Sequence, residues 1–237
     1  MLVSSSETPV VTALIVAAGM GRRLGSAVPK QFLPLAGIPL VAHSLRAFQE
    51  HCQVERLVLV LPRKGASSSL ELSDYSKLTT TVEGGETRQE SVRLGLAVVE
   101  EPGWVLIHDA ARPLVSEQLI GSVLEAARGS GAAVPACRVG DTLKQVEGEV
   151  VAGTLPREGL VQVQTPQAFR VDLAREAHEA ARRDGFLGTD DAQLVERLGR
   201  AVVWVVGNPI NLKITTEADL QLAAAWLQIC AGRGKGT

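Results

Sequence analysis

A short apolar run that ends abruptly in a glycine-rich loop is the feature that most constrains the fold of this chain. The run covers residues 12–17 and reads as a strand, and the loop then continues to Lys30. Glycines let a backbone turn tightly and bring its N–H groups close to a ligand, and cations beside them attract anions. The glycines and cations of this loop are Gly19, Gly21, Gly25, Arg22, Arg23 and Lys30. This combination indicates a polyphosphate site at the end of a buried strand.

The spacing within the loop excludes one common phosphate-binding motif and weakens another. A Walker A motif needs its lysine directly after the last glycine, whereas Lys30 lies five residues beyond Gly25. A dinucleotide-binding motif needs a third glycine where this chain has Leu24. The pattern that remains is Ala-Gly-x-Gly-x-Arg followed by Pro-Lys-Gln.

Composition favours a mostly parallel sheet flanked by helices. Of the 237 residues, 46% are hydrophobic and only 3% are aromatic, so Val, Leu, Ile and Ala must build the core. These side chains suit strands that are buried on both faces, as in parallel sheets. We therefore expect one Rossmann-like α/β domain over residues 1–237. Within it, the segment at residues 137–163, treated separately below, is expected to form a protruding β-arm.

Charge and cysteine content argue against several other classes of protein. A net charge of −2 offers no broad basic face for nucleic acid, and no run approaches the ~20 apolar residues of a membrane span. Cys52, Cys137 and Cys230 are widely spaced and form no C-x-x-C pair, which indicates reduced thiols. The N-terminus shows no targeting pattern, so we expect a cytoplasmic protein.

Hydrophobic periodicity and capping residues predict the order of the elements. Strands are expected at residues 12–17, 54–61, 79–82, 104–107, 132–136 and 201–206, the last of them in the core. Helices are expected to begin at Pro39 and to cover residues 87–100, 116–128, 171–183, 189–199 and 216–231. Thr87 with Glu90 and Thr216 with Asp219 form capping boxes, and Thr189 is expected to cap its helix.

The segment at residues 137–163 changes character, because short β-prone pieces alternate with turns and no helical pattern covers them. This pattern predicts a β-hairpin. An isolated hairpin is only marginally stable in water, so we expect the arm to lean on another surface.

Two further segments place polar groups near predicted strand ends. Gly84 and Gly85 precede the helix start at Thr87, an arrangement that brings backbone donors to a ligand. Asp109 follows the fourth strand, and ligands bind beyond the carboxyl ends of parallel strands. A carboxylate beside a polyphosphate loop suits Mg²⁺, which takes oxygen ligands and substrate phosphates. The local alternatives are an ordinary turn at the two glycines and an ion pair between Asp109 and Arg112.

Four motifs follow one another over most of the chain. They are Ala-Gly-x-Gly-x-Arg with Pro-Lys-Gln, His-Asp-Ala-x-Arg-Pro at 108–113, Thr-Pro-Gln-x-Phe at 165–169 and Asn-x-Lys-Ile-Thr at 211–215. In this combination the chain resembles the 2-C-methyl-D-erythritol 4-phosphate cytidylyltransferases of non-mevalonate isoprenoid synthesis. The resemblance implies transfer of a cytidylyl group from CTP to methylerythritol phosphate, with release of pyrophosphate, in a Mg²⁺-dependent homodimer.

The resemblance also assigns roles to residues of this chain. Arg23 and Lys30 are expected to be catalytic, and Asp109 is expected to hold the metal. The residues implied to bind the nucleotide are Ala17, Ala18, Gly19, Gly21, Gly84, Gly85, Arg88, Ser91 and Lys213. Those implied to bind the sugar phosphate are Asp109, Arg112, Thr142, Arg157, Thr165 and Lys213, with Arg157 reaching into the partner's active site.

Some alternatives stay open at the level of sequence. Ribitol 5-phosphate cytidylyltransferases share the Lys-Gln and Thr-Pro-Gln elements, and a catalytically silent nucleotide-binding module could use the same fold. An NAD-dependent enzyme is disfavoured by Leu24. Some relatives carry a second metal-binding aspartate where this chain has Ile210. Asp190 and Asp191 are explained as first-turn acids of a helix and stay outside the candidate site.

Overall fold

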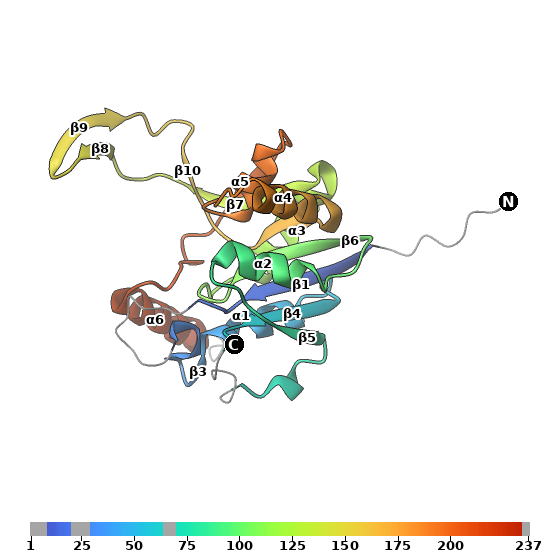
Figure 1. Ribbon diagram of the computed structural model, residues 1–237. Coiled ribbons are helices and arrows are strands. Elements are labelled where there is room, and N and C mark those ends of the chain that lie inside the picture. Colours follow the sequence, from blue (N-terminus) through green and yellow to red (C-terminus); the bar gives the residue numbers. More distant parts are fainter. Residues whose placement is uncertain (1–8, 20–28, 64–69, 234–237) are drawn as a thin grey trace.

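The computed structural model describes residues 9–19, 29–63 and 70–233, and most of their strands join one eight-stranded sheet (Figure 1). The strands of this sheet are β1 (Val10–Val16), β4 (Arg56–Leu61), β5 (Leu78–Glu83), β6 (Gly103–Asp109), β7 (Ala132–Arg138), β10 (Val161–Val163), β11 (Gln167–Arg170) and β12 (Val203–Val206). Their order is β12, β7, β11, β6, β1, β4 and β5, and β10 continues the line of β11 along β7. The expected mostly parallel α/β sheet is confirmed.

The central strands β1, β4 and β6 end at the same level of the sheet, and candidate site residues lie at these ends. In the register of the sheet, Val16 lies opposite Val60 of β4 on one side and opposite Asp109 of β6 on the other. The three strands are parallel, so the segments that follow them leave the sheet at one edge. The residues that directly follow β1, Ala17 to Gly19, therefore lie close to Asp109.

Helices cover both faces of the sheet, because successive side chains of a strand point to opposite faces. The helices are α1 (Leu40–Glu50), α2 (Arg88–Leu96), α3 (Glu117–Ser130), α4 (Val171–Arg183), α5 (Asp191–Arg197) and α6 (Glu217–Arg233). Ile15 packs in the core cluster that α1 and α3 complete, whereas its neighbour Leu14 packs in the cluster with α2, α4 and α5. A sheet buried on both faces explains the continuous apolar runs in the sequence.

A smaller cluster attaches the last helix to the edge of the molecule. Short 3₁₀ turns occur at Lys30–Phe32 and Leu72–Asp74, and β2 (Pro34–Leu35) and β3 (Ile38–Pro39) form a small sheet. Leu35 and Leu40 pack with Ile214 and with Ala223 of α6. This contact ties the segment before α6 to the region that follows the glycine-rich loop.

The predicted arm is a hairpin of β8 (Leu143–Glu147) and β9 (Val150–Leu155) that projects from the body of the molecule (Figure 1). It is shorter than the expected 137–163, because β7 continues to Arg138 and β10 returns to pair with it. The strands at both ends of the arm therefore belong to the main sheet.

Several predicted boundaries were wrong. α2 ends at Leu96 rather than at residue 100. α3 passes Gly129 and ends at Ser130, where it is capped by Gly131, whose φ of 90° only glycine adopts readily. His108 and Asp109 belong to β6 and not to the loop after it. Helix α1 begins one residue after Pro39, which closes β3.

The strands near β7 also differ from the prediction. The short β11 runs antiparallel between β6 and β7, and no strand was predicted for this segment. β12 is not a core strand, because it pairs with β7 alone at the edge of the sheet and leaves Trp204 and Val206 43% and 78% exposed. The exposure of β12 is therefore set by its position at the edge of the sheet, although its sequence is as apolar as that of a core strand.

The structure also bears on the cysteines and on the hydropathy of the helices within the described residues. Cys52, Cys137 and Cys230 are free thiols. Among the helices in this part of the chain, none combines the length and hydropathy that crossing a bilayer would need.

Candidate active site

A cleft of about 750 Å³ lies at the carboxyl edge of the sheet, beyond β1, β4 and β6. Nine of the residues that the sequence assigned to the site line it: Ala17, Ala18, Gly19, Lys30, Gly85, Arg88, Ser91, Asp109 and Lys213. They come from four separate segments of the chain. The fold therefore brings together most of the predicted nucleotide-binding residues.

The first segment of the cleft is held by a residue whose role the sequence did not reveal. Gln31 Nε2 donates hydrogen bonds to the carbonyl oxygens of Ala17 and Gly19, the latter at 2.9 Å. The neighbouring Lys30 Nζ donates to the carbonyl of Ile214 at 2.9 Å. Gln31 thus joins the two ends of the glycine-rich loop, and Lys30 joins the loop to the segment around Ile214, so both residues have a structural role.

Close backbone approach explains the glycine at position 84. A Cβ on Gly84 would lie 2.2 Å from Ala18 Cβ, so any other residue would push apart the segments after β1 and β5. Ser91 Oγ accepts a hydrogen bond from the Gly85 N–H at 3.1 Å and donates to the Thr87 carbonyl at 2.8 Å. Gly84 and Ser91 thus shape the cleft wall.

The helix start beside these glycines is capped largely as predicted. Thr87 Oγ1 accepts a hydrogen bond from the Glu90 N–H at 3.0 Å. The Glu90 carboxylate accepts from the N–H of Glu86 at 2.8 Å, one residue before the expected position. The capped turn fixes Arg88, the first residue of α2, at the mouth of the cleft.

Asp109 is the electrostatic centre of the cleft. Its Oδ1 lies 2.8 Å from Arg88 Nε and its Oδ2 lies 2.6 Å from Lys213 Nζ. Burial alone would raise the pKa of this carboxyl, but Arg88 and Lys213 outweigh burial and hold the pKa well below its usual value. Asp109 is therefore ionised, and the alternative of a pair with Arg112 across the turn is not what the structure shows.

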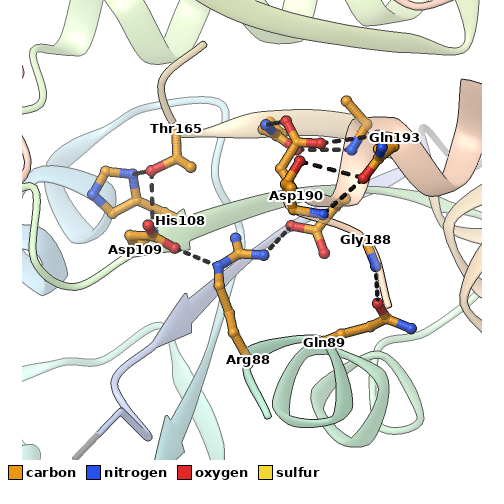
Figure 2. A network of polar contacts seen from close by, with 12 residues as sticks. Arg88, Gln89, His108, Asp109, Thr165, Gly188, Asp190 and Gln193 are labelled. Carbon is orange, nitrogen blue, oxygen red and sulfur yellow. Dashed lines mark hydrogen bonds and ion pairs between the residues drawn. The ribbon is translucent and has the colours of Figure 1, made fainter. Parts of the chain in front are cut away.

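Arg88 has a second carboxylate partner that sequence reasoning left out of the site. Its NH1 lies 2.9 Å from Oδ2 of Asp191, and Asp191 Oδ1 lies 3.1 Å from Nε2 of His178. Burial alone would lower the pKa of Arg88, but Asp191 and Asp109 raise it above its usual value. Figure 2 shows Arg88 reaching from α2 toward Asp109, with the start of α5 beyond it.

A buried hydrogen-bond chain fixes the end of β6. The Asp109 N–H donates to Thr165 Oγ1 at 3.1 Å, and Thr165 Oγ1 lies 3.2 Å from His108 Nδ1 (Figure 2). His108 Nε2 lies 3.1 Å from the carbonyl of Arg112, which can only accept. His108 therefore carries its hydrogen on Nε2, and the Thr165 hydroxyl donates to Nδ1.

Full burial lowers the pKa of His108 to about 4, so the imidazole is neutral at physiological pH. An unfolded histidine titrates near about 6.5, so between these values only the unfolded chain gains this proton. We expect the free energy of unfolding to fall by up to about 3 kcal/mol from this group as the pH drops from about 6.5 to about 4. Urea unfolding at a series of pH values, without added divalent cation, measures the slope.

The His108→Gln variant is the control for this pH dependence. It lacks the titrating group, so its free energy of unfolding should vary less over the same range, whatever its absolute stability. His43 and His51, whose pKa values burial also lowers, remain in the variant and contribute in the same direction. An equally steep decline in the variant would show that His108 is not responsible.

The Asn-x-Lys-Ile-Thr segment is pinned against the end of β6. Asn211 Nδ2 donates to the Thr165 carbonyl at 2.9 Å, and the backbone carbonyl of Asn211 accepts a hydrogen bond from Arg112 NH1 at 2.7 Å. The Ile214 N–H donates to the carbonyl of Ala111 at 2.8 Å. These bonds hold Lys213 over Asp109, although 104 positions separate the two residues in sequence.

The remaining predicted residues fall into three groups. Arg112 and Thr165 support the cleft from behind and are not part of its lining. Thr142 and Arg157 lie at the arm, where Arg157 NH1 donates to the carbonyl of Gly140. Gly21 and Arg23, like Arg22, lie outside the described residues.

The donor set fits a magnesium ion that is shared with a substrate. Within the described part of the chain, no group of three or more His, Cys, Asp or Glu side chains could hold a metal ion. This agrees with Ile210, which stands where some relatives carry a second metal-binding aspartate. Mg²⁺ is commonly held by one or two carboxylates, substrate phosphates and waters. Asp109 is ionised and lines the cleft, and its two oxygens retain lone pairs beyond those that face Arg88 and Lys213.

Comparisons with known proteins agree with this geometry. The family model for 2-C-methyl-D-erythritol 4-phosphate cytidylyltransferase matches residues 11–229. The enzyme of that name from Geobacillus kaustophilus is 44% identical over 218 residues, covering 91% of this chain and 96% of the relative. The one from Halalkalibacterium halodurans is 45% identical over 217 residues, covering 90% and 95%.

Solved structures give the same result. The crystal structure of the Thermus thermophilus enzyme of that name has a TM-score of 0.79 and 42% identity, covering 91% of this chain and 98% of the other. The Francisella tularensis enzyme has a TM-score of 0.80 and 31% identity, covering 92% and 99%. The fold, the order of the motifs and the cleft thus all agree: this chain belongs to the 2-C-methyl-D-erythritol 4-phosphate cytidylyltransferase family.

Proposed function

We propose that this chain transfers the cytidylyl group of CTP to 2-C-methyl-D-erythritol 4-phosphate. A phosphate oxygen of the acceptor attacks the α-phosphorus of CTP and forms the new P–O bond. The bond between the α-phosphorus and the bridging oxygen to the β-phosphate breaks, and pyrophosphate leaves with that electron pair. The acceptor is already an anion, so the reaction needs no strong general base.

One observation carries the proposal within the family. An ionised carboxylate, Asp109, lies between Arg88 and Lys213 in a cleft at the carboxyl edge of the sheet, with Lys30 on the same cleft. Two polyanions must meet in this reaction, and negative charge grows on the α-phosphate and the leaving group. Cations held in place by the fold supply the stabilisation that such a reaction needs.

Each group in the cleft has a proposed part in the reaction. Lys30, with Arg23 from the glycine-rich loop, stabilises the charge that develops in the transition state. Arg88 and Lys213 hold the nucleotide, and the backbone from Ala17 to Gly19 approaches its phosphates. Asp109 would hold Mg²⁺, which supplies Lewis-acid stabilisation of the triphosphate when bound.

The proposed acceptor site includes Arg112 and Thr165, which lie close to the end of β6. The arm supplies Thr142 and, from a partner subunit, Arg157. The Thr165 hydroxyl already donates to His108, so a phosphate near it would meet its lone pairs unless the hydroxyl turned. We therefore expect Arg112 and Arg157 to contribute more than Thr165 to phosphate binding.

The arm supports a proposed homodimer. It carries exposed apolar side chains along its two strands, and Val146, Val150 and Val151 are 61%, 69% and 56% exposed. Apolar side chains on a two-stranded hairpin favour burial against another surface. A second copy of the chain is the partner that would place Arg157 in an active site.

If Arg157 acts in the partner's site, two inactive variants should restore each other. In a dimer of Lys30→Ala and Arg157→Ala chains, one site carries both substitutions and the other carries neither. Random mixing of subunits should therefore recover about one quarter of wild-type activity. The measurement is pyrophosphate release after the two variants are mixed and allowed to exchange subunits.

The control for this experiment is each variant mixed with itself under the same conditions. Gel filtration shows whether the chains form dimers at the assay concentration. Mixtures no more active than the sum of the separate variants, in protein shown to be dimeric and to exchange, would place Arg157 in its own subunit's site or outside catalysis.

Pyrophosphate release with two acceptors in parallel tests the proposed function. The protein is incubated with CTP and Mg²⁺, and either methylerythritol 4-phosphate or ribitol 5-phosphate is added. Release that depends on methylerythritol phosphate supports the proposal. Release with ribitol phosphate alone would keep the chemistry and change the substrate, and no release with either would favour a silent nucleotide-binding module.

A further inference from the structure

Asp191 is a carboxylate whose burial needs a partner. It is the first residue of α5 and is only 2% exposed. A first-turn acid gains from the helix dipole at the surface, but a buried carboxylate also loses its hydration, which costs more than a dipole returns. The dipole therefore does not account for this residue, and the contacts of its two oxygens must.

Those contacts lead from the helix layer into the cleft. Asp191 Oδ2 lies 2.9 Å from Arg88 NH1, and Asp191 Oδ1 lies 3.1 Å from His178 Nε2 in α4. A carboxylate only accepts, so His178 must carry its hydrogen on Nε2. His178 is itself buried, with 2% of its side chain exposed, so it can hold the carboxylate in one orientation.

Arg88 is held along two edges of a planar group. Its Nε faces Asp109 and its NH1 faces Asp191, and these carboxylates come from β6 and α5. The Nε contact is a hydrogen bond and the NH1 contact is an ion pair, so Asp109 and Asp191 together restrict where the rigid guanidinium can lie. Without Asp191, the carboxylate left to Arg88 in this network would be Asp109, which the proposed function assigns to the metal.

We propose that Asp191, braced by His178, is a positioning residue that keeps the Arg88 guanidinium in place at the nucleotide pocket when Asp109 engages the triphosphate and its cation. This inference rests on the proposed function. Asp191 is not part of the cleft lining, and it acts through Arg88. Asp191 supplies a second anion for Arg88. Its attraction keeps the arginine in place when a cation bound at Asp109 repels it.

The Asp191→Asn variant tests this role by direct binding. The substitution keeps the size of the side chain and removes its charge. We expect the Kd for CTP, measured calorimetrically with Mg²⁺, to rise about tenfold, and kcat to change much less. The matched control is Asp172→Asn, which neutralises a first-turn acid of α4 in an exposed ion pair with Arg170 and should leave Kd unchanged.

A double-mutant cycle shows whether Asp191 acts through Arg88. In an Arg88→Gln background the further change Asp191→Asn should have little effect on Kd, because the group it positions is gone. If the two substitutions raise Kd independently, so that the factor in the double variant is the product of the two single factors, the proposal is overturned. So would an unchanged Kd in Asp191→Asn protein whose circular dichroism and Tm show that it is folded.

A second variant covers the case in which Asp191→Asn does not fold. His178→Leu removes the donor behind Asp191 and leaves the contact with Arg88, so it should raise Kd in the same direction by a smaller factor. An unchanged Kd in this variant would count against the brace. If the wild-type protein binds no CTP, the proposed function itself is refuted. Failure of the positioning role and failure of the proposed function therefore give different results.

Discussion

Replacing Asp109 by asparagine should lower kcat by about 10³ while the protein stays folded. The carboxylate is the anion that faces both Arg88 and Lys213 in the cleft, and it is the proposed ligand of the metal. An amide keeps the size of the side chain but offers one weak acceptor oxygen and turns an NH₂ group toward a cation. Two positive side chains would then lie close together without the charge that compensates them.

Pyrophosphate release measures this effect, with Kd for CTP determined separately in the presence and absence of Mg²⁺. Asp184→Asn is a matched control, because it makes the same chemical change in an exposed ion pair with Arg197. The Asn variant should also lose most of the dependence of CTP binding on Mg²⁺. Turnover within a few-fold of wild type would remove Asp109 from the mechanism.

The sequence predicted the parts of the site that have local signals. The glycines after β1 and the capped start of α2 follow strands, the acid is the last residue of β6, and parallel strands bring their ends together. The register of Val16 opposite Asp109 is what the structure adds. The motif around Lys213 needed the resemblance, because nothing local indicates that it lies over a residue 104 positions away.

The network behind Arg88 could not be predicted, because its signal is ambiguous in sequence. Asp191 reads as a first-turn acid whether it faces solvent or the core. Its role depends on how α5 packs beside α2 and α4, which no local pattern specifies. The same holds for Gln31, whose amide joins two backbone carbonyls that are remote from any capping or turn motif.

Tertiary contacts also decided between adjacent residues with similar local preferences. Thr189 and Asp190 are both good helix caps, and the sequence favoured Thr189. In the structure Asp190 is the cap, accepting from the Gln193 N–H at 2.9 Å. Its second oxygen accepts from Gln167 Nε2 at 2.8 Å, a contact that Thr189 could not supply from its position. A remote partner on β11 therefore fixed where α5 begins.

Replacing Lys30 by alanine should lower kcat by a factor of ~10²–10³, in line with the loss of one transition-state donor. Its ammonium group lies on the cleft and donates to the Ile214 carbonyl. In the proposed reaction it stabilises charge that grows on the α-phosphate, so the loss should appear in kcat more than in the Kd for CTP. Single-turnover assays with saturating CTP separate the two.

The contact with Ile214 suggests a purely structural role as the alternative for Lys30, and two variants distinguish the possibilities. Lys77→Ala removes a lysine that likewise donates to a backbone carbonyl, that of His51 at 2.8 Å, but lies outside the cleft lining, so kcat should not change. Lys30→Gln keeps a side-chain donor for the Ile214 carbonyl without a charge. If the charge matters, Lys30→Gln should be nearly as slow as Lys30→Ala, whereas recovery of turnover in Lys30→Gln would show that Lys30 serves to hold the segment around Ile214.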